Sequence, residues 1–310
     1  MVNSTQVSYF ILDAYFDTGM LKYLYFLVLT VVYLIIIAAN VLLIVVICVN
    51  RSFHEPMYLF LCSLFVNELY GSTGLFPLLL FQILKDVHMV SASLCFLQVF
   101  CLYSYGLIEF LTLSVMSYDR YLAICFPLQY NTRMTSNKVA MFTALIWFYP
   151  ILINVIIVYG LTEPLHLCGN VIDKVYCDNY CIVKLACSDT TANNIFGLCH
   201  VFGVIIFLII LIVYTYMRIL KVCFSGSKQT RHKAVSTCTP HLVSLMNFSF
   251  GVFFEILQSR FNMTNVPSMM RIFLSLYWLT GQPFVNPLLH GLKMTKIRIV
   301  YKSLLFGKRM

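Results

Sequence analysis

The sequence predicts an all-α membrane protein, a seven-transmembrane helix bundle with a short amphipathic C-terminal helix. The chain of 310 residues is 60% hydrophobic and only 11% charged. A soluble domain carries roughly 25% charged residues, so this chain lacks the polar groups needed to cover a surface in water. Lipid can cover it instead. The apolar residues fall into seven long runs, which we expect to form a single domain.

Each apolar run is long enough to cross a bilayer, because a helix needs about 20 residues to span a hydrocarbon core of about 30 Å. Two runs carry one acidic residue each, Glu68 and Glu109, and the other five runs, some of them a few residues shorter than the spans expected below, are free of charge. Helices satisfy their own backbone hydrogen bonds in lipid, and the short alternating strands of a membrane barrel are not seen. We therefore expect spans at about residues 23–50, 56–84, 89–122, 139–162, 190–220, 233–258 and 270–292.

Basic residues in the connections set the orientation. Of the 21 lysines and arginines, 15 follow the first, third, fifth or seventh span, and the other six lie on the opposite side. Positively charged loops stay in the cytoplasm. We therefore expect a multi-pass plasma-membrane protein with residues 1–22 extracellular and residues 293–310 as a cytoplasmic tail. Asn3 begins an Asn-Ser-Thr sequence, which is a glycosylation acceptor only outside the cell.

The tail after Leu292 has apolar residues at helical spacing, with basic residues between them. This pattern is typical of a short amphipathic helix lying on an anionic lipid surface. The net charge of +9 is thus explained by membrane topology, and no nucleic-acid-binding motif is visible. The expected lipid contacts are those of the bundle and of this helix.

Several cysteines gather on the expected extracellular side. Cys95 lies at the outer start of the third span, and Cys168, Cys177, Cys181 and Cys187 lie between the fourth and fifth spans. An extracellular location permits disulfides, which would hold this segment as a lid over the bundle. The segment has roughly 30 residues without expected secondary structure, which is unusual unless a loop is functional. Metal binding is the alternative, with His166 as the one histidine close by.

Four motifs occur along the chain, each in or beside a different span. Residues 56–61 read Pro-Met-Tyr-Leu-Phe-Leu, and residues 116–130 read Met-Ser-Tyr-Asp-Arg-Tyr-Leu-Ala-Ile-Cys-Phe-Pro-Leu-Gln-Tyr. Residues 233–242 read Lys-Ala-Val-Ser-Thr-Cys-Thr-Pro-His-Leu, and residues 283–287 read Pro-Phe-Val-Asn-Pro. Together these motifs closely resemble the signature of vertebrate odorant receptors, a branch of the rhodopsin-like (class A) G-protein-coupled receptors. Residues 176–191 resemble the fish-type members.

The resemblance implies a receptor that binds a small-molecule odorant outside the cell. Inside the cell it would activate a stimulatory heterotrimeric G protein and so the cyclic AMP pathway, in the sense of smell. The resemblance also implies two disulfides, Cys95 with Cys177 and Cys168 with Cys187, leaving Cys181 free or in a minor bridge.

A cytoplasmic switch is implied by the same motifs. Asp119 can hold the guanidinium of Arg120 while the bundle is closed, and the freed guanidinium can then contact a G protein. The alternative is that Arg120 only anchors its helix at the membrane edge. The chain departs from the family at His290, where a Tyr is usual, at Ala39, where a Gly is usual, and near Gly251, where a proline is common. The residues assigned to the switch are Asp119, Arg120, Tyr121, Lys233, His241, Asn286 and Pro287.

Glu68 and Glu109 are acidic residues within the expected spans. An ionisable group in lipid is costly and indicates a functional site by default. Near Asn286 the two carboxyl groups could hold one sodium ion or share one proton. The alternative is a neutral, hydrogen-bonded pair that only sets helix packing.

The ligand pocket is expected in the outer half of the bundle, beneath the lid. Ligand pockets are mostly apolar with a few polar groups. Arg260 could pair with an anionic group of a ligand, and Glu255 could bind a cation. Alternatively, the apolar residues are packing and Arg260 only anchors its helix at the lipid headgroups. The residues assigned to the pocket are Leu102, Tyr103, Gly106, Leu107, Val252, Ile256 and Arg260.

An enzyme is not expected, since no nucleophile elbow, phosphate loop or metal-ligand cluster is visible, and no cofactor is expected beyond the sodium ion. A transporter is a weaker alternative. A transporter should show internal repeats and broken spans in matching positions, and the seven unlike spans of this chain do not show them. A rhodopsin-like chemoreceptor used outside the olfactory system remains open.

Overall fold

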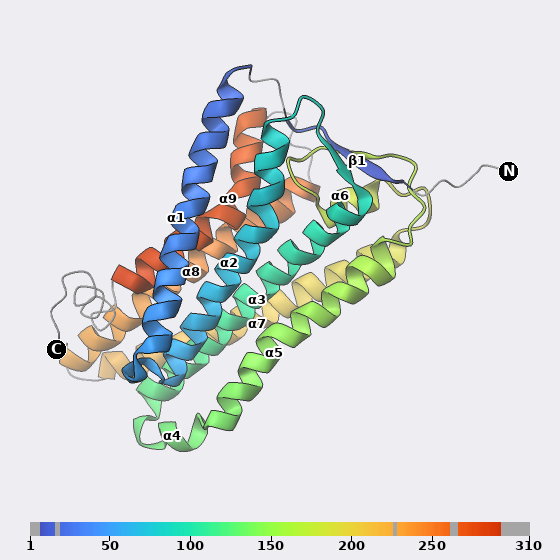
Figure 1. Ribbon diagram of the computed structural model, residues 1–310. Coiled ribbons are helices and arrows are strands. Elements are labelled where there is room, and N and C mark those ends of the chain that lie inside the picture. The colour runs from blue at the N-terminus through green and yellow to red at the C-terminus, as the bar shows by residue number, and fades with distance from the viewer. Residues whose placement is uncertain (1–6, 16–18, 226–227, 261–265, 293–310) are drawn as a thin grey trace.

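A bundle of seven long helices dominates the computed structural model, which describes residues 7–15, 19–225, 228–260 and 266–292 (Figure 1). The bundle confirms the predicted fold class. Its helices are α1 (Leu21–Val49), α2 (Pro56–Ile83), α3 (Ala92–Cys125), α5 (Ser136–Val155), α7 (Thr191–Ser225), α8 (Lys228–Arg260) and α9 (Ser268–Asn286). Two π-helical segments, η3 (Ile156–Thr162) and η4 (Pro287–Leu292), continue α5 and α9.

Six helices of the described part are long and apolar enough to cross a membrane, and α9 is the further helix of the bundle. Large apolar side chains cover their outer faces, and Leu27, Phe148 and Met246 are each more than half exposed. In water such a surface would be unfavourable, but it suits contact with lipid. The interior holds polar side chains such as Asn67 and Asn286, both fully buried.

Helix α3 lies at the centre of the bundle, where it packs against α2, α5, α7 and α8. Its first turn is capped by Ser91, whose hydroxyl accepts a hydrogen bond from the backbone N–H of Leu94, as the free N–H groups of a helix start require. Helix α2 begins with Pro56, and proline suits the first turn because it lacks the N–H that would go unpaired there.

Close contact between α8 and α9 depends on Gly251. A Cβ added there would lie 2.7 Å from Cβ of Trp278 and 3.0 Å from its Cα. The two helices therefore approach at a distance that only glycine permits. Where the family commonly has a proline that bends the helix, this chain has a residue that allows tight packing.

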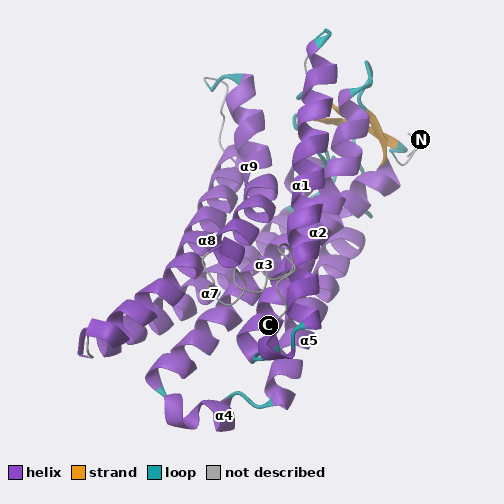
Figure 2. Cartoon of the chain, turned by 60° about the vertical axis from the view of Figure 1, so that its left-hand side comes forward, coloured by secondary structure: helices purple, strands orange, loops and turns teal. Residues whose placement is uncertain are grey.

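Short helical segments join the long helices at one end of the bundle. They are η1 (Arg51–Phe53), η2 (Pro127–Gln129) and α4 (Tyr130–Arg133). At the opposite end lies a small three-stranded sheet (Figure 2). Its strands are β1 (Tyr9–Leu12), β2 (Met89–Ser91) and β3 (Val171–Ile172), with β1 in the middle, antiparallel to β2 and parallel to β3.

The segment between η3 and α7, residues 163–190, is called the lid below. The expectation that it has no secondary structure was wrong, because it contains β3, the helix α6 (Asn179–Lys184) and a bridge between Leu167 and Ala186. Buried backbone groups need hydrogen-bond partners, and pairing with β1 supplies them for β3. Residues 89–91, expected within the third span, form β2 instead.

Some predicted features fall outside the described residues. They are the glycosylation acceptor Asn3 and the cytoplasmic tail at residues 293–310 with its amphipathic helix.

Candidate functional site

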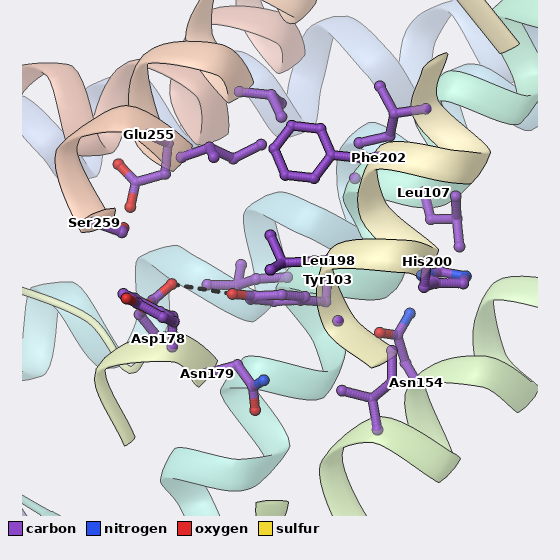
Figure 3. Close-up of a pocket in the computed structure, with 18 of the residues that line it drawn as sticks. Tyr103, Leu107, Asn154, Asp178, Asn179, Leu198, His200, Phe202, Glu255 and Ser259 are labelled. Carbon is purple, nitrogen blue, oxygen red and sulfur yellow. Dashed lines mark hydrogen bonds between the residues drawn. The ribbon is translucent and has the colours of Figure 1, made fainter. Parts of the chain in front are cut away.

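A cavity of about 190 Å³ lies beneath the lid, between α3, η3, α7 and α8 (Figure 3). Its walls are mainly apolar, as expected of a small-molecule site. All of the residues that the sequence analysis assigned to the pocket line it: Leu102, Tyr103, Gly106 and Leu107 from α3, and Val252, Ile256 and Arg260 from α8. The spacing along each helix places these residues on one face.

Apart from Glu255, which was named as a possible cation site, the sequence analysis did not assign the rest of the lining. Asp178, Asn179 and Tyr180 reach the cavity from the lid, and Asn193 and His200 reach it from α7. The polar residues of α7 could have been found, because polar side chains within a span usually face the interior of the bundle. The lid residues could not, because their position depends on how the lid folds.

Two disulfides hold the lid in place. Cys95 of α3 is bonded to Cys177, with 5.4 Å between their Cα atoms, and Cys168 is bonded to Cys187 at 5.5 Å. Cys181 is a free thiol. The first bond fixes Asp178, the next residue along the chain, over the outer end of α3. In the part of the chain that the structure describes, no group of three His, Cys, Asp or Glu side chains could hold a metal ion.

A cluster of charged side chains joins the lid to α8 at the edge of the cavity. We call it the lid cluster, and it consists of Lys174, Tyr176 and Asp178 of the lid with Glu255 and Ser259 of α8. The ammonium of Lys174 donates to Oε1 of Glu255, lies 2.7 Å from the Ser259 hydroxyl, and is 3.5 Å from Oδ2 of Asp178. The phenol of Tyr176 donates to the same Glu255 oxygen at 2.6 Å.

Charge pairing keeps the lid cluster ionised in spite of its burial. Burial by itself lowers the pKa of Lys174, but the carboxylates of Asp178 and Glu255 outweigh that effect and raise its pKa above the ordinary value. Burial by itself raises the pKa of Asp178, yet the Lys174 ammonium and hydrogen bonds from Cys181 and Tyr103 bring its pKa below the ordinary value. Both residues thus carry their charges at neutral pH.

A second polar group lies deeper in the bundle, around Glu68 and Glu109. Asn286 donates from Nδ2 to Oε1 of Glu68 and, at 2.9 Å, to Oε1 of Glu109. Asn67 donates to Oε2 of Glu109 at 3.0 Å, and Tyr105 donates to Oε2 of Glu68 at 3.1 Å. The structure therefore brings together the three residues that the sequence analysis assigned to a sodium site. Two converging carboxyl groups fit a hard cation, and they fit a shared proton equally well.

The predicted switch residues occupy three places. Asp119 and Arg120 lie near the C-terminal end of α3, 3.6 Å apart between Oδ2 and a guanidinium nitrogen, and the ring of Tyr121 lies 6.4 Å from that of Tyr214. His241 bridges three helices, since its ring contacts the Tyr216 phenol at 2.6 Å and the Leu113 carbonyl at 2.8 Å.

Further along the chain, Asn286 belongs to the group around the two glutamates and Pro287 starts η4. His290, also in η4, stands where a Tyr is usual. It is buried, and its Nε2 lacks a hydrogen-bond partner among the described residues. Lys233 lies on α8, and its side chain is outside the described residues.

Comparison with known proteins decides the family. The family model for the olfactory receptor matches residues 29–308. The chain belongs to the olfactory receptor family. It is therefore a multi-pass membrane receptor that couples to G proteins, and the family consists of receptors rather than enzymes.

Individual relatives agree with this assignment. The receptor is 33% identical to human olfactory receptor 52D1, over 89% of this chain and 87% of that protein. It is 30% identical to mouse olfactory receptor 4B13, over 96% of each chain. The crystal structure of squid rhodopsin superimposes on it with a TM-score of 0.73 at 17% identity, covering 93% of this receptor and 82% of that chain. At that identity the likeness concerns the fold.

Proposed function

We propose that this olfactory receptor lies in the plasma membrane with its N-terminus outside and its C-terminus in the cytoplasm. It binds a small, mainly apolar odorant in the cavity beneath the lid. It then activates a stimulatory heterotrimeric G protein and raises cyclic AMP. The ligand class and the G-protein type go beyond what membership of the family establishes.

The observation that carries this proposal is that α3 and α8 both line the cavity at one end and both carry predicted switch residues towards the other. Leu107 and Val252 line the cavity, while Arg120 and His241 lie nearer the cytoplasmic ends of the same helices. A ligand that binds one arrangement of α3 and α8 better than another shifts the equilibrium between them. Such a shift would loosen the hydrogen bond between His241 and the Leu113 carbonyl.

Arg120 is the proposed contact with the G protein. In the present arrangement its guanidinium lies beside the buried carboxylate of Asp119. A rearrangement of the helix ends would release the guanidinium toward the cytoplasmic mouth. Lys233 at the cytoplasmic part of α8 and Tyr121 on α3 belong to the same proposed surface, and Asn286 with Pro287 transmits changes in the bundle interior to it.

We also propose that Glu68, Glu109 and Asn286 bind one sodium ion in the inactive state. The carboxylate oxygens supply the negative charge and hard ligands that such a cation requires. An ion that binds only one arrangement of the bundle stabilises that arrangement. A shared proton at the same place is the competing chemistry, and it predicts no response to sodium.

The test of the receptor function is ligand-stimulated cyclic AMP in cells that express the full chain, screened against volatile and water-soluble small molecules. Gly106→Trp would fill the cavity that Gly106 lines, so the response should disappear while surface expression persists. The matched control is Gly203→Trp, because Gly203 of α7 has no neighbouring atom within 4 Å of an added Cβ. A normal response from Gly106→Trp would place the ligand elsewhere.

Three narrower expectations remain predictions. They are the likeness of residues 176–191 to fish-type receptors, the glycosylation of Asn3, and use in smell rather than in another tissue. The relatives named above are mammalian and do not decide the first. Localising the transcript would decide the last, since a chemoreceptor in another tissue would have the same cavity.

A further inference from the structure

We propose that the ligand of this receptor is a small organic cation, an amine with an apolar body, whose ammonium group binds Glu255 at the edge of the lid cluster. This inference rests on the proposed function, because it assigns a chemical class to the ligand of the same cavity. It follows from an unused acceptor, from the charge around it and from the shape of the cavity.

The unused acceptor is Oε2 of Glu255. The other oxygen of that carboxylate accepts hydrogen bonds from Lys174 and Tyr176, whereas Oε2 is buried and has no partner among the described residues. A buried acceptor without a partner is unfavourable, and Glu255 lines the cavity. A ligand with an N–H donor would supply the missing hydrogen bond.

A second lining residue has the same shortage. Oδ1 of Asn179, at the start of α6, is also buried and unpartnered within the described part of the chain. Both open positions among the lining residues are therefore hydrogen-bond acceptors. An ammonium group, which has donors and no acceptor, fits the open acceptor of Glu255, whereas a carboxylate does not.

The charge of the lid cluster points the same way. Its two carboxylates, Asp178 and Glu255, are balanced by one ammonium, that of Lys174. The cluster thus keeps one negative charge in a site largely shielded from water, where an isolated charge is expensive. A ligand cation on Oε2 of Glu255 would bring the cluster to neutrality, with Lys174 on the other oxygen of the same carboxylate.

The acidic side chains of the cavity are grouped together. Figure 3 shows Glu255, Ser259 and Asp178 at one side of the cavity, while Phe202 and Leu107 lie toward the other, where the uncharged polar side chains of His200 and Asn154 also lie. An amine with an unbranched hydrocarbon chain matches that division, with its head at Glu255 and its chain along α3 and α7. The hydroxyl of Ser259, 2.7 Å from the Lys174 ammonium, is a further polar neighbour of the head group.

Arg260 is the competing anchor, because its cation would select an acid instead. Its side chain is exposed, and its guanidinium lies 4.3 Å from the centre of the Tyr180 ring. A solvated guanidinium stacked on an aromatic ring already has favourable contacts. Glu255 has the buried, unused atom, so the observations favour a cationic ligand over an anionic one.

The test compares three probes that share one chain and differ in head group: n-heptylamine, n-heptanol and heptanoic acid. Their affinities are measured from ligand-induced thermal stabilisation of the purified full-length receptor at neutral pH. We expect the amine to bind at least about 30-fold more tightly than the alcohol, as for a desolvated charge pair. Glu255→Gln should remove that advantage and leave alcohol binding unchanged.

Two further variants keep the test decisive. Glu255→Gln alone removes one of the two carboxylates that pair with the buried Lys174 and leaves Asp178 at 3.5 Å; losing one partner of a buried charge can destabilise the fold. The triple variant Lys174→Met, Asp178→Asn and Glu255→Gln removes all three charges of the lid cluster. It should fold while still lacking the preference for the amine. The matched control is Asp173→Asn, which should retain the preference for the amine. Asp173 is an exposed acid of the lid that pairs with Arg271 at 3.3 Å.

Three results would overturn the proposal. They are binding of the amine no tighter than the alcohol, tightest binding of heptanoic acid, and an amine preference that survives in the triple variant. The proposed signalling fails separately: a receptor that binds the amine but does not raise cyclic AMP would contradict the G-protein assignment and leave the ligand class intact.

Discussion

The phenol of Tyr130 donates a 2.7 Å hydrogen bond to Oδ1 of Asp119, while the guanidinium of Arg120 lies 3.6 Å from Oδ2 of the same carboxylate. Tyr130 is the first residue of α4, beyond the end of α3. The carboxylate is therefore shared between a neutral donor from the connection that follows α3 and the cation of the proposed switch.

The switch can be tested at both partners of that carboxylate. Arg120→Ala should abolish ligand-stimulated cyclic AMP at matched surface expression, because it removes the proposed G-protein contact. Asp119→Asn should raise basal cyclic AMP, because it removes the charge that holds the guanidinium. Tyr130→Phe should raise it less, since it deletes a single hydrogen bond of about 1 kcal/mol. Normal signalling by Arg120→Ala would reject the assignment.

Sodium binding predicts an ion-dependent affinity for agonist. If the ion stabilises the inactive bundle, replacing sodium by a large organic cation at constant ionic strength should increase agonist affinity. Glu68→Gln and Glu109→Gln should each remove that dependence, and the exposed acid Asp173 provides the control Asp173→Asn. A sodium dependence unchanged from the wild type in both glutamine variants would leave these residues a packing role.

Packing between α8 and α9 can be tested at Gly251. Gly251→Ala gains about 1 kcal/mol of helix propensity, but its methyl group would lie 2.7 Å from Cβ of Trp278, and overpacking costs about 1–3 kcal/mol. We expect a lower melting temperature for the purified receptor. At Gly203 an added Cβ has no neighbouring atom within 4 Å, so Gly203→Ala should melt no lower than the wild type. An unchanged melting temperature for Gly251→Ala would refute the close contact.

Disulfide pairing can be determined by peptide mapping without reduction. We expect one linked peptide pair for Cys95 and Cys177 and another for Cys168 and Cys187. Cys95→Ser should reduce surface expression, because loss of a native disulfide typically costs about 2–5 kcal/mol. Cys199→Ser is the control, since that thiol is free and exposed. A free thiol at Cys95 would contradict the proposed attachment of the lid.

The role of Arg260 is decided by the sign of one effect. If Arg260 binds the ligand, Arg260→Ala should weaken an acidic agonist far more than its neutral amide analogue. If Glu255 binds a cation, Arg260→Ala should leave the affinity for an amine agonist unchanged or increase it slightly, because the substitution removes a positive charge from the rim of the cavity. Dose–response curves for heptanoic acid, heptanamide and n-heptylamine distinguish the two.

How far the sequence predicts the site differs between helices and lid. The positions of Leu107 on α3 and Ile256 on α8 follow from helical periodicity alone, because a helix fixes which residues share a face. Asp178 and Asn179 do not follow from any local pattern. They reach the cavity because the bond from Cys177 to Cys95 holds the lid against α3.

Glu255 shows which properties of a residue follow from the sequence and which require the folded structure. Its place on α8 made it a candidate cation site by sequence. Only the folded lid shows that Lys174 and Tyr176 use one of its oxygens and leave the other unpartnered among the described residues. The hydrogen bonds of a buried group can be assigned only when the residues near it in space are known. For Glu255 these residues are about 80 positions away in the chain.

The sequence by itself determined the class of this protein, its seven spans and its family. Apolar runs and short motifs are local properties, and the length of an apolar run alone decides whether it can cross a bilayer as a helix. The tertiary structure decided what the polar residues inside the bundle do. Glu68, Glu109 and Asn286 come from three different helices, and the charges of the lid cluster come from the lid and α8. Such groups are set by how the helices and the lid pack, since an interior charge is tolerated only where packing brings it a partner.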